Sequence, residues 1–127
     1  SGWVNATESA KLTASDSTKY DSFGKGVAIS GDTVIVGASR DDDTGENSGS
    51  AYLFEKHVSE GWISATETKL TASDGTAGDN FGYSVALNGE TAIVGARGDN
   101  SDSGSAYIFK SETSPGVNPG LIIYLLD

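Results

Sequence analysis

One sequence unit occurs twice in this chain, and the repetition constrains the fold more than any other feature. Residues 2–54 recur as residues 61–109, and both copies contain Lys-Leu-Thr-Ala-Ser-Asp, Phe-Gly, Ile-Val-Gly-Ala and Ser-Gly-Ser-Ala-Tyr in the same order. A unit of this size cannot bury its own apolar face, so it stacks on neighbouring units in a solenoid, propeller or array. Because such arrays normally need about three units or more, we expect further sequence or further copies of the chain to complete the structure.

Short runs of β-branched and aromatic residues, separated by Gly, Asp, Asn and Ser, predict an all-β fold. In the first copy we expect strands at residues 26–30 and 33–37, joined by a tight turn at Gly31-Asp32, then strands at 50–55 and 62–72. The second copy repeats the first three within residues 83–110, with a turn at Asn88-Gly89 and a last strand at 105–110. The counterpart of the fourth strand, residues 3–14, precedes the first copy.

These strands predict four-stranded antiparallel sheets that are offset in phase along the chain. Residues 1–14 form an outer strand that completes a neighbouring sheet, 15–72 form a whole unit, 73–110 form a three-stranded unit, and 111–127 form a tail outside the repeat. Head-to-tail association would supply the missing strand, and we favour three chains in one ring over two or four. The alternative is a fragment of a longer single-chain propeller. We expect the apolar residues 121–126 of the tail to be buried as a strand, since they are too few to span a bilayer.

The charge balance restricts the partners. The chain has 18 acidic residues against 8 Lys and Arg, a net charge of −10. Binding to nucleic acid or to an anionic membrane is therefore unfavourable, whereas cations and basic partners are favoured. There is no cysteine, which excludes disulfides and thiol chemistry. The first residues lack the basic and apolar regions of a signal peptide.

Two ordered motifs carry a family resemblance. Phe23-Gly24 followed by Val36-Gly37-Ala38, and the same motifs at residues 81–82 and 94–96, resemble FG-GAP repeats, the blades of integrin α-subunit-type β-propellers. The resemblance covers residues 2–110 and is strongest to bacterial versions. It implies four-stranded blades around a central channel and a non-enzymatic binding or adhesion role outside the cell or at its surface. A protein or a glycan would be the ligand.

The resemblance does not carry over a calcium site. Integrin-type repeats hold calcium in an Asp-rich loop between their first two strands, but here that link is only Ser30-Gly31-Asp32 or Asn88-Gly89-Glu90. Calcium takes about 6 to 8 oxygen ligands, which a two-residue turn cannot provide. The remaining candidates for Ca²⁺ lie in the two loops that follow Gly-Ala, and they are Asp41, Asp43, Asp99 and Asp102. Neither loop has the EF-hand spacing, so we expect solvated turn residues and no cofactor.

A second acidic pattern precedes each Phe-Gly. Asp16 and Asp21 recur as Asp74 and Asp79 with the same spacing. A carboxylate pair can hydrolyse glycosides, but that chemistry needs two different environments, and a repeated pair gives the same environment twice. We therefore expect Asx-turns between the units. His57 lies in a variable link, where a surface role is expected, so we predict no catalytic residue.

The large aromatic residues also follow the repeat. We expect them to pack between stacked sheets, because aromatic side chains dominate core burial. A sugar-stacking face, which would make the chain a lectin, is the alternative, and a hydrolase that uses Asp16, Asp21 and His57 is a third and less favoured function. The aromatic residues in question are Trp3, Trp62, Tyr52, Tyr107, Phe54 and Phe109.

Overall fold

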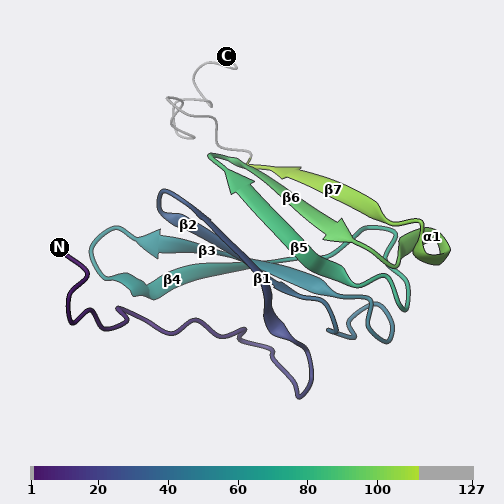
Figure 1. Cartoon of the computed structure of the whole chain (residues 1–127), viewed down its shortest axis with the longest axis horizontal. Helices are drawn as coiled ribbons and strands as arrows, with labels where there is room; N and C mark the ends of the chain where they lie inside the picture. The colour runs from purple at the N-terminus through teal and green to yellow at the C-terminus, as the bar shows by residue number, and fades with distance from the viewer. Residues whose placement is uncertain (1, 112–127) are drawn as a thin grey trace, which may run out of the picture.

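The computed structural model describes residues 2–111 and consists of two antiparallel sheets (Figure 1). The first sheet has four strands in the order β1-β2-β3-β4, and the second has three in the order β5-β6-β7. The prediction of an all-β fold is therefore confirmed. The elements are β1 (Phe23–Ser30), β2 (Thr33–Ala38), β3 (Ser50–His57), β4 (Gly61–Leu70), β5 (Phe81–Asn88), β6 (Thr91–Ala96), the short α1 (Asp99–Asp102) and β7 (Ser105–Lys110).

The first hairpin of each sheet turns on a glycine with positive φ. Gly31 has φ +57°, and the Gly31-Asp32 turn is confirmed. In the second copy the turn is Gly89-Glu90, one residue later than predicted, because Asn88 still pairs with Thr91 in the ladder. The opening strands also begin earlier than expected, at the Phe-Gly motif, where the ladder contains a bulge between Phe23 and Gly26.

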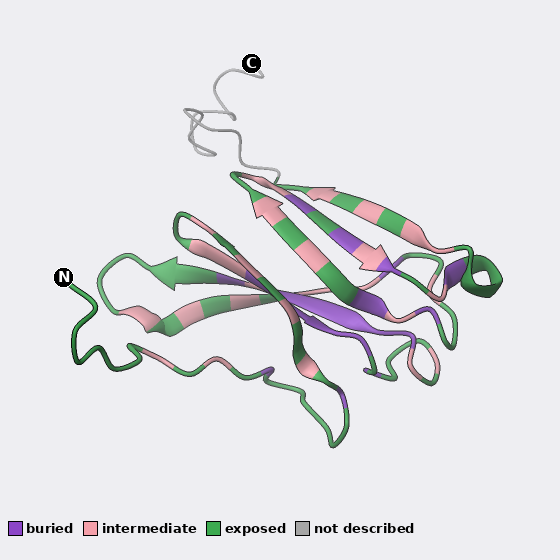
Figure 2. Ribbon diagram, viewed as in Figure 1, coloured by how far each residue is buried: buried purple, intermediate pink, exposed green. Residues whose placement is uncertain are grey.

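The two sheets stack face to face with one core cluster between them, and a second cluster lies on the opposite face of the first sheet (Figure 2). Ile35, Ala51 and Leu70 of the first sheet pack against Phe81 and Val94 of the second. The backbones approach closely here: a Cβ added to Gly37 would overlap the carbonyl oxygen of Gly82. Stacking at this distance therefore requires glycine at position 37.

Residues 2–14 join neither sheet of the described chain, so the outer strand expected at residues 3–14 in a neighbouring blade stays a prediction. This segment runs along the first sheet on the side away from β5, β6 and β7 (Figure 1). Leu12 and Ala14 pack against Val36 and Tyr52 there. The segment lies against the face of the sheet and not beside an edge strand, so its backbone meets no ladder partner.

The second sheet ends at β7, whose outer edge has no strand beside it among the described residues. Residues 2–111 thus form two blade-like sheets and no closed propeller. The strand predicted at residues 121–126 lies outside the described residues.

Candidate functional site

Side chains from four segments of the chain meet at one lysine. Asp16 comes from the link before β1, Asp41 and Asp43 from the loop after β2, Tyr52 from β3, and Lys69 from β4. We call these five residues the lysine site. The Lys69 Nζ lies 2.5 Å from an Asp16 carboxylate oxygen and 2.8 Å from one of Asp41, and it also forms an ion pair with Asp43. The three N–H donors of an ammonium thus match three carboxylates.

Hydroxyl groups complete the lysine site. The Tyr52 hydroxyl donates to Asp16 over 2.7 Å, and the Ser50 hydroxyl donates to buried Asp41 over 2.6 Å. Tyr52 and Lys69 are direct partners in the β3–β4 ladder, which places the ammonium 5.4 Å from the tyrosine ring centre. The ladder register therefore fixes the cation over the acidic loop.

The charges of the lysine site shift each other's titration. Hydrogen bonds from Lys69 and Tyr52 lower the pKa of Asp16. Burial alone would raise the pKa of Asp41, but hydrogen bonds from Lys69 and Ser50 outweigh it and hold that pKa below its usual value. Burial would likewise lower the pKa of Lys69, yet the carboxylates around it raise the pKa. Asp16, Asp41 and Lys69 are therefore all ionised at neutral pH.

A metal ion does not fit the lysine site as it is built. Carboxylate oxygens of Asp16, Asp41 and Asp43 lie within 4.8 Å of one another, a spacing that suits a cation. The Lys69 ammonium already lies among them, and calcium would need about 6 to 8 oxygens in its place. The link between β1 and β2 offers no alternative, because Asp32 there pairs with Lys56 at 3.4 Å.

The second copy builds the same arrangement without the lysine. The Tyr107 hydroxyl lies 2.8 Å from an Asp74 carboxylate oxygen and 3.0 Å from one of Asp99. Burial and then these carboxylates raise the pKa of Tyr107, while hydrogen bonds from Ser105 and Tyr107 lower the pKa of Asp99. We call Asp74, Asp99 and Tyr107 the open acidic site. Asp74 and Asp99 line a surface hollow, and Asp102 lines it too.

The repeated pairs Asp16/Asp21 and Asp74/Asp79 divide into two roles. Asp21 and Asp79 are buried and accept from the backbone N–H and hydroxyl of Thr18 and Thr76, respectively, so they fix the links that lead into β1 and β5. The expectation of local turns is wrong for Asp16 and Asp74, which bond to tyrosines of distant strands. Sequence reasoning missed this because the partners are separated by about 35 residues, although Lys69 and both tyrosines belong to the repeated motifs.

The residues considered for hydrolysis are not assembled. The Nδ1 of His57 accepts from the backbone N–H groups of Ser59 and Glu60 in the β3–β4 turn. Along β3 it is five residues from Tyr52, the partner of Asp16, which is roughly 16 Å at 3.3 Å per residue. Asp16, Asp21 and His57 therefore do not form one catalytic centre.

Tyr107 and Phe109 pack between the two sheets, as predicted. Tyr52 and Phe54 pack instead on the opposite face of the first sheet, against Leu12 and Ala14. Trp62 is half-buried and belongs to neither cluster. Phe23 meets Tyr52 edge to face at 5.5 Å, and Phe81 meets Tyr107 in the same way at 5.4 Å. Trp3 is exposed instead. Its segment belongs to no sheet, which is why the packing expected for Trp3 is not found.

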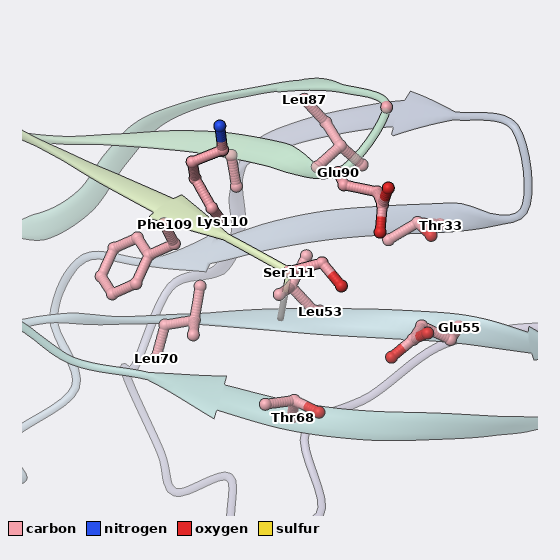
Figure 3. Close-up of a pocket in the computed structure, with 12 residues that line it drawn as sticks. Thr33, Leu53, Glu55, Thr68, Leu70, Leu87, Glu90, Phe109, Lys110 and Ser111 are labelled. Atoms are coloured by element: carbon pink, nitrogen blue, oxygen red, sulfur yellow. The ribbon is translucent and has the colours of Figure 1, made fainter. Parts of the chain in front are cut away.

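A cavity of about 500 Å³ opens between the sheets at the end where the β1–β2 and β5–β6 turns lie (Figure 3). Leu53, Leu70 and Phe109 supply apolar surface, and Glu55 and Glu90 supply carboxylates. A few polar groups around apolar walls are typical of small-ligand sites. Sequence reasoning missed this cavity, because its lining comes from six strands and the β5–β6 turn.

Removal of the Tyr52 hydroxyl tests the lysine site. We expect Tyr52→Phe to lower the free energy of unfolding by about 1.5 kcal/mol, because a hydrogen bond to a charged group contributes roughly that amount. Urea denaturation at pH 7 measures the change. Tyr107→Phe is the matched control, and its effect should be smaller because Tyr107 is less buried than Tyr52. Equal losses in the two variants would contradict the role assigned to the lysine site.

The stacked sheets, the repeated acid–tyrosine sites and the glycine contacts define a class of protein: an all-β repeat protein whose units are blade-like sheets. Comparison with protein families matches the FG-GAP repeat to residues 6–54 and again to residues 65–109. The chain belongs to the FG-GAP repeat family. Searches of curated proteins and of solved structures gave no match.

Proposed function

We propose that this chain is a non-enzymatic binding module that acts outside the cell, as a piece of a β-propeller. The observation that carries the proposal is the FG-GAP match over both copies, because repeats of this family are associated with integrin-like extracellular binding. The site chemistry supports it, since the acidic side chains of the lysine site bond to Lys69 and to the hydroxyl groups of Tyr52 and Ser50 and leave no free acid–base pair there. No helix within residues 2–111 has the length and hydropathy to cross a membrane.

The acidic surface favours a basic protein as partner. With a net charge of −10, the chain attracts cationic surfaces and repels nucleic acid. A glycan is the second candidate, favoured by the cavity of Figure 3, which is lined by the ring of Phe109 and by polar residues such as Glu55 and Glu90. The two candidates differ in salt dependence, because attraction between exposed charges is screened over about 8 Å at physiological ionic strength.

The immobilised chain should be screened against an array of extracellular proteins and against a glycan array, each at 50 and 500 mM NaCl. We expect a basic protein to bind at low salt and to weaken at least about tenfold at high salt. A glycan hit lost in Glu55→Gln/Glu90→Gln, but retained in the control Glu60→Gln, would favour the second candidate. Turnover of any substrate in a broad hydrolase panel would overturn the non-enzymatic proposal.

A further inference from the structure

The lysine site contains an ammonium group and a third aspartate, Asp43, which the open acidic site lacks among the described residues. Both place a tyrosine hydroxyl against two aspartates, but only the first contains an ammonium group. A phenol has one proton and can donate to one carboxylate at a time. Asp74 and Asp99 therefore share the one phenol proton of Tyr107, in a position where the repeat elsewhere holds a cation. Asp99 also accepts from Ser105 and from the backbone N–H of Asn100.

The ammonium absent from the open acidic site belongs, in the first sheet, to a fourth strand that the second sheet lacks within residues 2–111. Lys69 lies on β4, opposite Tyr52 in the β3–β4 ladder, and within the described residues no strand lies beside β7 in the same way. In the repeated motif Lys-Leu-Thr-Ala-Ser-Asp, the counterpart of Lys69 is Lys11. Lys11 is exposed and forms no ion pair with any residue from 2 to 111.

The segment around Lys11 already lies where a fourth strand belongs relative to the sheet that follows it. Leu70 and Ala72 pack into the core between the two sheets. Their counterparts Leu12 and Ala14 pack on the opposite face of the first sheet, against Val36 and Tyr52. Within residues 2–111 there is no sheet that could hold this segment as its outer strand.

Each sheet has one apolar face that is uncovered within residues 2–111. The equivalent faces of the other sheet are the two that stack on each other inside the chain. Val27 and Ile29 are 65% and 64% exposed, whereas their counterparts Val85 and Leu87 pack between the sheets. On the second sheet, Ile93 is 40% exposed, whereas its counterpart Ile35 is fully buried. Ile108, the counterpart of Leu53, is 66% exposed. A second copy of the chain is therefore complementary to both faces.

We propose that the open acidic site is a binding site for Lys11 of a second copy of this chain. Residues 8–12 of that copy pair with β7 as its fourth strand, in the register that β3 and β4 show. Tyr107 then lies opposite Lys11, as Tyr52 lies opposite Lys69, and Ile108 lies opposite Ala10. In the same register Glu8 lies opposite Lys110, a pair of opposite charges.

Each copy offers one such segment and one open edge, so the contact is heterologous and repeats from copy to copy. The donated segment keeps its packing on its own first sheet, because that packing uses the face of the segment and the pairing with β7 uses its edge. Three copies give six sheets, within the roughly 4 to 8 blades of known propellers, and we favour this ring.

The first test is the mass in solution of the full chain at 1 to 100 µM, by native mass spectrometry and light scattering. The wild type is expected to form a closed oligomer, and Lys11→Glu is expected to raise its dissociation constant at least about tenfold. Lys56→Glu, at the far end of β3, is the charge-matched control and should assemble normally. A monomeric wild type, or assembly that Lys11→Glu leaves unchanged, overturns the proposal.

The second test measures the register of the pairing between residues 8–12 and β7. The chain has no cysteine, so only the introduced cysteines can form disulfides. Ala10→Cys/Ile108→Cys is expected to form disulfides between copies under mild oxidation, because directly opposed residues meet the Cα distance that a disulfide needs. The control Ala10→Cys/Ala106→Cys is two residues out of register and should cross-link more slowly. Equal rates for the two pairs contradict the proposed strand pairing, whatever the mass measurement gives.

Discussion

Replacing Lys69 with methionine is expected to lower the free energy of unfolding by about 3 kcal/mol at pH 7. The substitution leaves the carboxylates of Asp16, Asp41 and Asp43 within 4.8 Å of one another and without their cation. Removing one partner of a buried ion pair typically costs about 3 to 5 kcal/mol, and we take the lower limit because Asp16 and Asp43 are partly exposed. Urea denaturation of the monomer, followed by circular dichroism, measures the loss.

Lys11→Met is the matched control for this experiment. It removes the corresponding lysine of the repeat, which has no ion-pair partner among residues 2–111, so its effect should stay within about 0.5 kcal/mol. Similar losses for the two variants would show that the ion pairs of Lys69 do not stabilise the fold.

The pH dependence of the free energy of unfolding, compared between wild type and Lys69→Met, is a separate test of these ion pairs. Because the pKa values of Asp16 and Asp41 are lowered in the folded state, their contribution to stability is complete above the unfolded value of about 3.9 and is lost as the pH falls through the folded values. The difference between wild type and Lys69→Met should therefore shrink as the pH is lowered from 5 to 2. A constant difference over this range would contradict the assignment.

Replacing Gly37 with alanine is expected to destabilise the fold by about 3 kcal/mol, through the packing of the two sheets. The new methyl group would overlap the carbonyl oxygen of Gly82, a backbone atom that cannot move without shifting β5. Overpacking a well-packed core costs about 1 to 3 kcal/mol, and we take the upper limit because the obstacle is backbone. Thermal and urea denaturation measure the effect.

Gly95→Ala is the control, since Gly95 is the counterpart of Gly37 in the second copy. Its nearest obstacle is the hydroxyl of Ser84, which can rotate away. Monomer stability should therefore be almost unchanged at low protein concentration. If both alanine variants lost stability equally, the close approach of Gly37 to Gly82 would not be the cause.

Much of the fold could be predicted from local signals in the sequence. The turn at Gly31-Asp32 and the alternation along residues 50–55 were sufficient to place β1, β2 and β3, because hairpins are specified by their own residues. The strand expected at residues 3–14 could not be settled in this way. A strand exists only where a neighbouring backbone accepts its hydrogen bonds, and no single-chain pattern states where that neighbour is.

The candidate site was less accessible to sequence reasoning. The acidic loop of Asp41 and Asp43 was noticed as a group of charges, but its cation comes from β4, and only the β3–β4 register brings Lys69 to Tyr52. The sequence favours a turn at Asp16, because short aspartate side chains often bond to their own backbone. Pairing each repeated aspartate with the repeated lysine and tyrosine would have been the available signal.

The cation of the lysine site is tethered to the polypeptide, and this sets how the protein behaves in different surroundings. Chelating agents and calcium-poor media cannot extract an ammonium group that the backbone carries, so the acidic loop stays ordered at any dilution. In our proposal the equivalent cation of the second unit arrives with another molecule, and its occupancy follows mass action. One motif thus gives permanent cohesion within a molecule and concentration-dependent cohesion between molecules.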